Sequence, residues 1–258
     1  MTKHYLAAAA AASLLVLAAA PAVACTGTTV LFEDDFSFAD PAWGNYEWAR
    51  IADGKMTIQV DPGLGYSLLN QTSLYVDFDV CIDVVQHNTD PSTAWASLIF
   101  WGLDYQNYYA LEVAGNGYVK VTRLQNNRVL SPVDWTLTEG VVNPGEEVNR
   151  LRVRAIGNIA QVFVNGQQVA QFRGQPPEGG GLIGIYSLAP ADAAASYDFS
   201  NLRITTPDGP IEEPGFGPGE GGVDNGGGGS GGGGAPEPGP VEEGDGSGEV
   251  TGKGAPKN

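Results

Sequence analysis

Short runs in which apolar and polar residues alternate dominate this sequence, and the clearest one extends from residue 148 to residue 172. It begins with three apolar residues that alternate with three arginines, namely Leu151, Val153 and Ala155 against Arg150, Arg152 and Arg154. This period of two predicts a half-buried strand. Gly157-Asn158 and Asn165-Gly166 divide the run, and Asn-Gly favours a type I′ hairpin. The run therefore predicts a meander of three antiparallel strands.

Similar β-rich runs recur every eight to twelve residues or so, separated by Gly, Asn, Asp and Pro, and no convincing amphipathic helix interrupts them. The predicted strands begin near Thr28, Tyr46, Lys55, Leu74, Thr93, Tyr108, Tyr118, Val148, Ile159, Gln168, Leu182 and Ala194. So many antiparallel strands in one domain favour two packed sheets. The fold class we predict is an all-β, two-sheet antiparallel sandwich.

The chain begins with the pattern of a secretory signal peptide, which we assign to residues 1–24. Lys3 is followed by an apolar run from Leu6 to Ala20 and by the small residues Ala22 and Ala24 of a cleavage site. The run is shorter than the roughly 20 residues of a membrane-spanning helix, and no later segment approaches that length. We therefore expect an exported protein, periplasmic or secreted, without a membrane span.

Cleavage after Ala24 leaves Cys25 as the first residue, and two interpretations of this cysteine follow. It can be lipidated, or it can form a disulfide with Cys81, the other cysteine of the chain. A bacterial lipobox usually has a large aliphatic residue where this chain has Ala22. We favour the disulfide and keep lipoprotein anchoring as the alternative.

Residues 207–258 are built mainly from Gly, Pro, Glu and Asp, and we predict a disordered tail. The tail holds 10 acids and 2 lysines, which supply about half of the net charge of −17. Residues 25–206 remain as one domain, and this domain is acidic as well. Nucleic acid is therefore a poor partner, because it requires a basic footprint. The oligomeric state is left open.

Several motifs of residues 25–206 resemble the concanavalin A-like lectin/glucanase superfamily, of the laminin-G-like and 3-keto-disaccharide hydrolase-like kind. They are Phe32 to Phe36 with Trp43, Asp53 to Ile58, Leu98 to Trp101 with Asp104, Asn107, Tyr108 and Tyr109, Asn149 to Val153, Val164 to Gly166, Leu182 to Tyr186 and Tyr197 to Ile204. The resemblance implies a jelly-roll fold. It implies no single activity, because the superfamily includes lectins, hydrolases and adhesive modules.

Three functions follow from the resemblance and the predicted export. The first is a module that binds carbohydrate or mediates interactions at the cell surface. The alternatives are a glycoside hydrolase of the 3-keto-disaccharide hydrolase-like type and a structural envelope or matrix protein. A glycosidase needs two carboxyl groups flanking the scissile bond. The candidates are Asp77, Asp79, Asp83, Asp104 and Glu112, although the run from Asp77 to Asp83 lacks the final glutamate of the family 16 glycosidase pattern.

Aromatic residues give the preferred ligand site. Alternation from Trp95 to Trp101 places both indoles on one face of a strand, and the next strand offers Tyr108 and Glu112. Such a platform suits a sugar, whose C–H face stacks on a ring while its hydroxyls bond to polar groups. A core role for the aromatics is the competing interpretation, and Trp135 fits either role.

The arginines also have two interpretations. Arg152 and Arg154 either bind the ligand or, with Arg150, pair with the acids of Asp77 to Asp83 on a facing strand.

No cofactor is expected, apart from calcium as a hypothesis. The oxygen ligands would come from Asp34, Asp35 and Asp198, if their strands pair. Residue 87 holds the only histidine after the predicted cleavage site, which argues against a histidine-rich zinc site.

Overall fold

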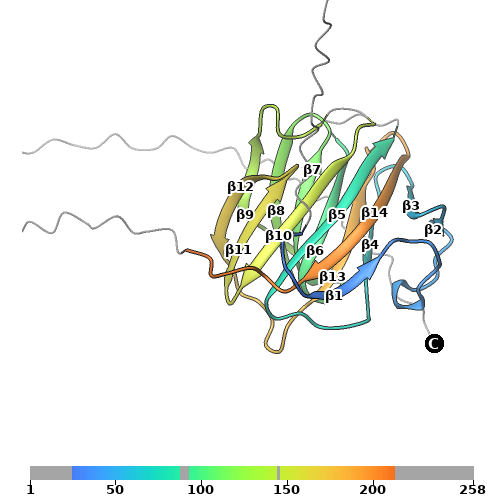
Figure 1. Cartoon of the computed structure of the whole chain (residues 1–258). Helices are drawn as coiled ribbons and strands as arrows, with labels where there is room; N and C mark the ends of the chain where they lie inside the picture. The colour runs from blue at the N-terminus through green and yellow to red at the C-terminus, as the bar shows by residue number, and fades with distance from the viewer. Residues whose placement is uncertain (1–24, 88–92, 144–145, 213–258) are drawn as a thin grey trace, which may run out of the picture.

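The computed structural model describes residues 25–87, 93–143 and 146–212. These residues form two packed antiparallel sheets, as predicted. Figure 1 shows the larger sheet in front, with β10, β5 and β14 at its centre and the smaller sheet behind. The predicted signal peptide and nearly all of the predicted tail lie outside the described residues.

The two sheets differ in size and in the order of their strands. The larger sheet has the order β12 (Gln167–Arg173), β11 (Ile159–Val164), β10 (Asn149–Ile156), β5 (Phe78–His87), β14 (Ala195–Thr205), β3 (Lys55–Val60) and β2 (Ala49–Ala52), with β1 (Val30–Asp34) paired to β14. The smaller sheet has the order β4 (Gly65–Leu69), β13 (Leu182–Leu188), β6 (Trp95–Asp104), β7 (Asn107–Ala114), β8 (Tyr118–Gln125) and β9 (Arg128–Leu137).

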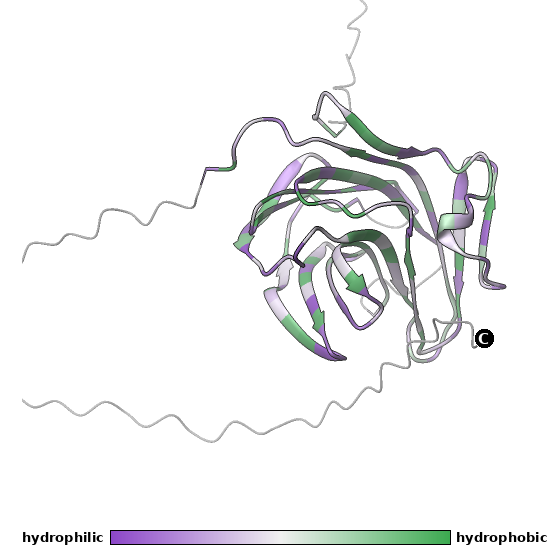
Figure 2. Cartoon of the chain, turned by 90° about the horizontal axis from the view of Figure 1, so that it is seen from below, coloured by the Kyte–Doolittle hydropathy of each residue, from purple (hydrophilic) through white to green (hydrophobic). Residues whose placement is uncertain are grey.

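A single apolar core fills the space between the two sheets. Hydrophobic and polar residues alternate along most strands in Figure 2, so each sheet turns one apolar face inward. On β5 the inward residues are Phe78, Val80 and Ile82, and on β7 they include Leu111 and Val113. The residues between them face away from the core. Each sheet therefore has a second, outer face on which side chains are free to serve other roles.

The predicted meander is β10, β11 and β12. Asn165 and Gly166 join β11 to β12 with φ angles of 50° and 83°, which are the positive angles that a type I′ turn requires. Leu151 and Val153 of β10 point into the core, and the arginines between them point outward. The alternation of residues 150–155 is thus confirmed.

Two strands were not predicted, and both lie at an edge of the smaller sheet. β4 is five residues long and begins with Gly65, a residue type that is depleted in strands, so its pattern is weak. β9 contains Pro132, and nearly all of its residues are exposed. Proline is tolerated at an edge, where one side of the strand needs no ladder partner.

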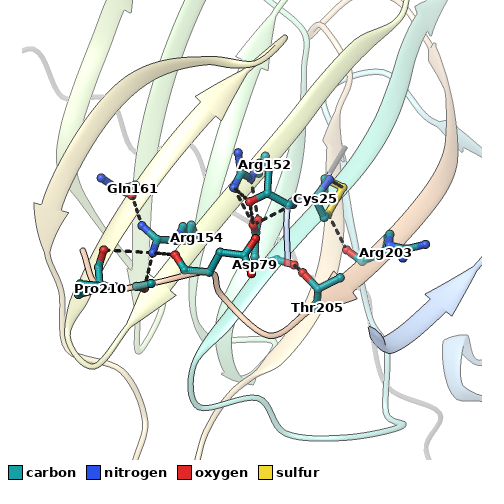
Figure 3. Close-up of polar contacts among 12 residues, drawn as sticks. Cys25, Asp79, Arg152, Arg154, Gln161, Arg203, Thr205 and Pro210 are labelled. Carbon is teal, nitrogen blue, oxygen red and sulfur yellow. Dashed lines mark hydrogen bonds and ion pairs between the residues drawn. A yellow bond between two sulfur atoms is a disulfide. The ribbon is translucent and has the colours of Figure 1, made fainter. Parts of the chain in front are cut away.

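Two of the three outward arginines of β10 pair with acids of β5, and Figure 3 shows the pair of Arg152 with Asp79. Arg152 donates from Nε and Nη2 to the two oxygens of Asp79, at 2.7 and 2.6 Å. Arg150 makes the same two-bond contact with Asp83, at 2.6 and 2.7 Å. The first pair is buried, with Asp79 0% and Arg152 8% exposed. The pairing hypothesis is confirmed for these two arginines.

Both ends of the described domain are fastened to the same outer face of the larger sheet. Cys25 forms a disulfide with Cys81 of β5, which confirms the predicted pairing. Next to it, the Thr26 hydroxyl accepts a hydrogen bond from Arg152 and donates one to Asp79. A thiol consumed in this disulfide is not available for lipidation.

Arg154 holds the other end. Its Nη2 donates to the backbone oxygens of Asp208, Gly209 and Pro210, and its Nη1 donates to Gln161 (Figure 3). Ile211 is buried, although residues 207–212 were assigned to the predicted tail. These six residues lie along the sheet.

The described residues contain one helical turn, Pro41–Trp43, of the 3-10 type. Within this part of the chain there is no helix with the length and apolar character needed to cross a membrane.

The buried pair of Asp79 and Arg152 leads to a stability prediction. We expect Asp79→Asn to lower the free energy of unfolding by about 3–5 kcal/mol, because Arg152 remains buried without its counter-charge. Guanidinium denaturation measures the loss. The matched control is Glu33→Gln, which breaks the exposed pair of Glu33 with Arg203 at 2.9 Å and should cost less than about 1 kcal/mol. Equal losses in the two variants would contradict the assigned role of burial.

Candidate functional site

A row of polar side chains crosses the outer face of the smaller sheet. Strand pairing aligns Ser67 with Tyr186, Tyr186 with Ser97, Ser97 with Glu112, and Glu112 with Lys120. Their neighbours along each strand, such as Leu98 and Leu111, point into the core, so the aligned residues all face outward. We call these five residues, Ser67, Tyr186, Ser97, Glu112 and Lys120, the central row.

An aromatic pocket lies next to the central row. Trp95 of β6 and Trp135 of β9 meet edge to face, with ring centroids 5.5 Å apart. With Ala114, Asn116 and Tyr118 they line a pocket of about 250 Å³. Trp95 is half-buried, whereas Trp135 and Tyr118 are exposed. The Lys120 ammonium lies 5.6 Å from the Trp135 ring and so joins the pocket to the central row.

Glu112 is the carboxyl group of the central row, and it lies at the middle of the sheet. It is 5% exposed, and its Oε2 has no hydrogen-bond partner within the described chain. The hydroxyl of the facing Ser97 is also buried without a partner there. Buried polar atoms are nearly always hydrogen-bonded. These two exceptions are adjacent on the outer face of the sheet, and the described chain supplies no partner for either atom.

The surroundings of Glu112 favour its neutral form. Burial raises its pKa to about 7, while attraction to Lys120 and contact with the Thr122 hydroxyl limit the rise. Burial likewise raises the pKa of Tyr108, and the negative charge of Glu112 adds to this effect. The pKa of Tyr186 is raised for the same two reasons, with a further contribution from Tyr108. The rings of Tyr108 and Tyr186 also pack in an apolar patch on this outer face, with Leu69, Ile99 and Leu182.

Three of the predicted ligand residues, Trp95, Tyr108 and Glu112, lie on this outer face. A fourth, Trp101, lies in the core instead. Trp101 was expected beside Trp95, but it is 2% exposed and packs in the core against Phe100 and Tyr109. The cause is a bulge at the end of β6, where Trp101 adopts a φ of 49° and the register with β7 shifts. An extra residue in one strand reverses the alternation beyond it.

The other two predicted ligand residues, Arg152 and Arg154, lie on the opposite sheet. Arg152 is bound to Asp79 and Thr26, and Arg154 to Gln161 and residues 208–210. These bonds, rather than a ligand, account for the two buried guanidinium groups.

The candidate catalytic acids do not gather around Glu112. Asp79 and Asp83 pair with arginines on the outer face of the larger sheet. Asp77 accepts the Gly157 amide at 2.7 Å, and Asp104 accepts the Gln106 amide at 2.7 Å in the turn between β6 and β7. Each of these four carboxylates thus has a structural partner.

The three aspartates of the calcium hypothesis do not meet. β1 pairs with β14 as required, but Asp34 lies opposite Leu202, four residues beyond Asp198. Asp34 accepts hydrogen bonds from the Trp43 indole NH and the Phe36 backbone NH. Asp35 accepts one from the Ser37 backbone NH. Asp198 binds Thr57, Lys55 and His87. In the described ranges, no three His, Cys, Asp or Glu side chains are grouped as metal ligands.

Sequence reasoning left several residues of this face unassigned or undecided, among them Ser97, Lys120, Trp135 and Tyr186. Ser97 and Lys120 follow from simple alternation on strands that were predicted. Tyr186 follows Ile183 and Ile185, whose period of two already places it outward. Trp135 had no such signal, because its strand was not predicted.

The buried carboxyl group of Glu112 predicts a pH-dependent stability. Between about pH 4.5 and pH 7 the folded state keeps a proton that the unfolded chain has lost, so the free energy of unfolding falls as the pH rises through this interval. Glu112→Gln removes the titration. We expect the stability of this variant relative to the wild type to increase from pH 4 to pH 8, by on the order of 3 kcal/mol. Denaturation curves across this range test the expectation, with the exposed Glu147→Gln as control. Parallel curves for wild type and Glu112→Gln would contradict it.

Comparisons with known proteins identify the fold. No protein-family model matches the chain, and no curated protein matches its sequence. A β-1,3-1,4-glucanase (lichenase) from a mouse hindgut metagenome is similar in structure, with a TM-score of 0.51 and 9% identity over 68% of this chain and 98% of that one. LamAcat from Zobellia galactanivorans has a TM-score of 0.51 and 11% identity over 69% and 98%. The β-glucanase of Bacillus licheniformis has 0.50 and 12% over 70% and 99%.

At these identities the likeness establishes the fold alone. The described domain has the concanavalin A-like jelly-roll fold, which agrees with the fold that its sequence motifs implied, while the laminin-G-like or 3-keto-disaccharide hydrolase-like kind stays a prediction.

Proposed function

We propose that this protein is an exported carbohydrate-binding module, and that it holds a glycan on the outer face of its smaller sheet. In this proposal one sugar ring packs against Trp135 in the aromatic pocket. The hydroxyls of the glycan bond to Glu112, Ser97, Tyr108 and Tyr186. Lys120 lies between the two regions.

The observation that carries the proposal is the position of the unpartnered polar atoms of Glu112 and Ser97 beside an open aromatic pocket. Sugar rings have an apolar C–H face and a rim of hydroxyls, so they need both kinds of surface at once. Two of the solved neighbours are glucanases by name, which makes β-glucans the first ligands to test.

Binding is favoured over glycoside hydrolysis by the number of carboxyl groups. Retaining glycosidases place two carboxyl groups about 5 Å apart, and inverting ones about 6.5–9.5 Å apart. Glu112 is the sole carboxyl group of the central row, and no other described acid contributes to its raised pKa. Hydrolysis would need a second acid on this face.

The proposed export is supported by the disulfide. Disulfides persist in oxidising compartments such as the periplasm or the extracellular space, and Cys25 lies directly after the predicted cleavage site. Both ends of the described domain are fastened to the larger sheet, on the side opposite to the proposed glycan face. A module attached through either end would therefore present the glycan face outward.

The test of this function begins with a glycan array that includes β-1,3-1,4-glucan, followed by affinity electrophoresis on the glycans that bind. We expect Trp135→Ala to weaken binding at least ten-fold, because the exposed ring supplies the stacking surface. Val129→Ala is the matched control. It removes an exposed apolar side chain from the same strand, outside the pocket lining, and should leave affinity unchanged.

Three results would go against the proposal. Unchanged affinity in both Trp135→Ala and Glu112→Gln would exclude this face as the site. A wild type that binds nothing on the array would favour a structural role. Release of reducing ends from a bound glycan, abolished in Glu112→Gln, would favour the hydrolase alternative.

A further inference from the structure

A second pocket lies at the other end of β7. It has a volume of about 180 Å³, and its lining includes Trp101, Tyr108, Tyr109, Arg123, Gln125 and Gln175. The aromatic pocket borders Ala114, five residues along β7 from Tyr109, so the two pockets are about 17 Å apart at roughly 3.4 Å per residue.

Arg123 gives this pocket a positive charge, which is unusual in so acidic a protein. It is the only fully charged group in the lining, which contains no acid. Its guanidinium lies over the Tyr109 ring, 5.4 Å from the ring centre, and makes no ion pair or hydrogen bond with the described chain. By contrast, Arg150, Arg152 and Arg203 all pair with carboxylates. An unpaired arginine in a hollow of so acidic a protein is available for an external anion.

The wall of the pocket is closely packed and contains a second donor without an acceptor. Trp101 is wedged against Gly174, where a β-carbon would approach the indole ring to 2.3 Å, so this close packing needs glycine. The Tyr109 hydroxyl accepts a hydrogen bond from the backbone NH of Gln175 at 2.9 Å. This bond holds the loop that forms one side of the pocket. The Trp101 indole NH is buried and has no acceptor among the described residues.

We propose that this pocket binds a sugar acid, with the carboxylate of the ligand on Arg123 and its ring against the aromatic wall. A guanidinium matches a carboxylate through two parallel hydrogen bonds. The side-chain amides of Gln125 and Gln175 suit hydroxyl groups. The volume is below the 300–1,000 Å³ of a typical ligand pocket, so it fits one small ring rather than a chain.

This site does not depend on the proposed glycan face. The two share no more than Tyr108 and the strand that carries it. The source of the sugar acid, a free monosaccharide or the end of an acidic glycan, is distinguished by comparing monomeric glucuronate with an oligosaccharide that ends in glucuronate.

The experiment follows the indole NH signals of the full chain by two-dimensional NMR during titration with sodium glucuronate, glucose or acetate. We expect glucuronate to shift the Trp101 signal saturably, and glucose and acetate to bind at least ten-fold more weakly. Trp101→Phe assigns the signal. Arg123→Gln carries the test because Arg123 is half-buried and unpaired, and we expect it to weaken glucuronate binding at least ten-fold. Arg128→Gln, at an exposed arginine of the neighbouring β9, is the control and should bind as the wild type does.

Equal affinity for glucuronate and glucose, or unchanged glucuronate binding in Arg123→Gln, would overturn the proposal. Shifts at Trp95 and Trp135 instead of Trp101 would place the ligand on the glycan face and also overturn it. Retention of glucuronate binding in Trp135→Ala would support two separate sites. Failure at one pocket can thus be distinguished from failure at the other.

Discussion

The buried pair of Asp79 and Arg152 is the interaction on which the arrangement of the larger sheet depends. It joins β5 to β10 at the centre of that sheet, on the face opposite to the core. A slip of one residue would turn Arg152 into the core and expose Val153, so charge pairing and apolar burial select the same register. The pair also binds Thr26 beside the disulfide, and therefore the register of two central strands and the position of the N-terminal segment are set together.

This ion pairing makes the two outer faces of the sandwich different from each other. On β5 and β10 of the larger sheet, Asp79 pairs with Arg152 and Asp83 with Arg150, and Arg154 is engaged by the backbone of residues 208–210. On the smaller sheet Glu112 and Ser97 have polar atoms without such partners in the described ranges. A buried polar atom without a partner costs free energy, about 1–3 kcal/mol for a neutral group. The proposed ligand face is thus the one that bears this cost.

Alternation in the sequence was enough to predict the two-sheet fold, the β10 to β12 meander and the outward direction of Trp95, Tyr108 and Glu112. It failed at Trp101, because a bulge depends on packing against Gly174 and Gly181, which lie far along the chain. The partner of each arginine was also beyond the sequence alone, since the order β10-β5-β14 brings together strands that are distant in sequence. Composition indicated that Asp and Arg stripes would attract, but only the sheet order shows that they are neighbours.

The raised pKa of Glu112 bears on which ligands suit the site. Near pH 7 the carboxyl group is present in both its protonated and its ionised form. The protonated form donates and accepts hydrogen bonds, whereas the carboxylate only accepts them. A ligand group that only accepts would lose its bond when Glu112 ionises, and one that only donates could not use the proton of the neutral form. A hydroxyl does both, and the facing Ser97 has the same property. The chemistry of the central row therefore fits a hydroxyl-rich ligand across the pH range in which its one carboxyl group titrates.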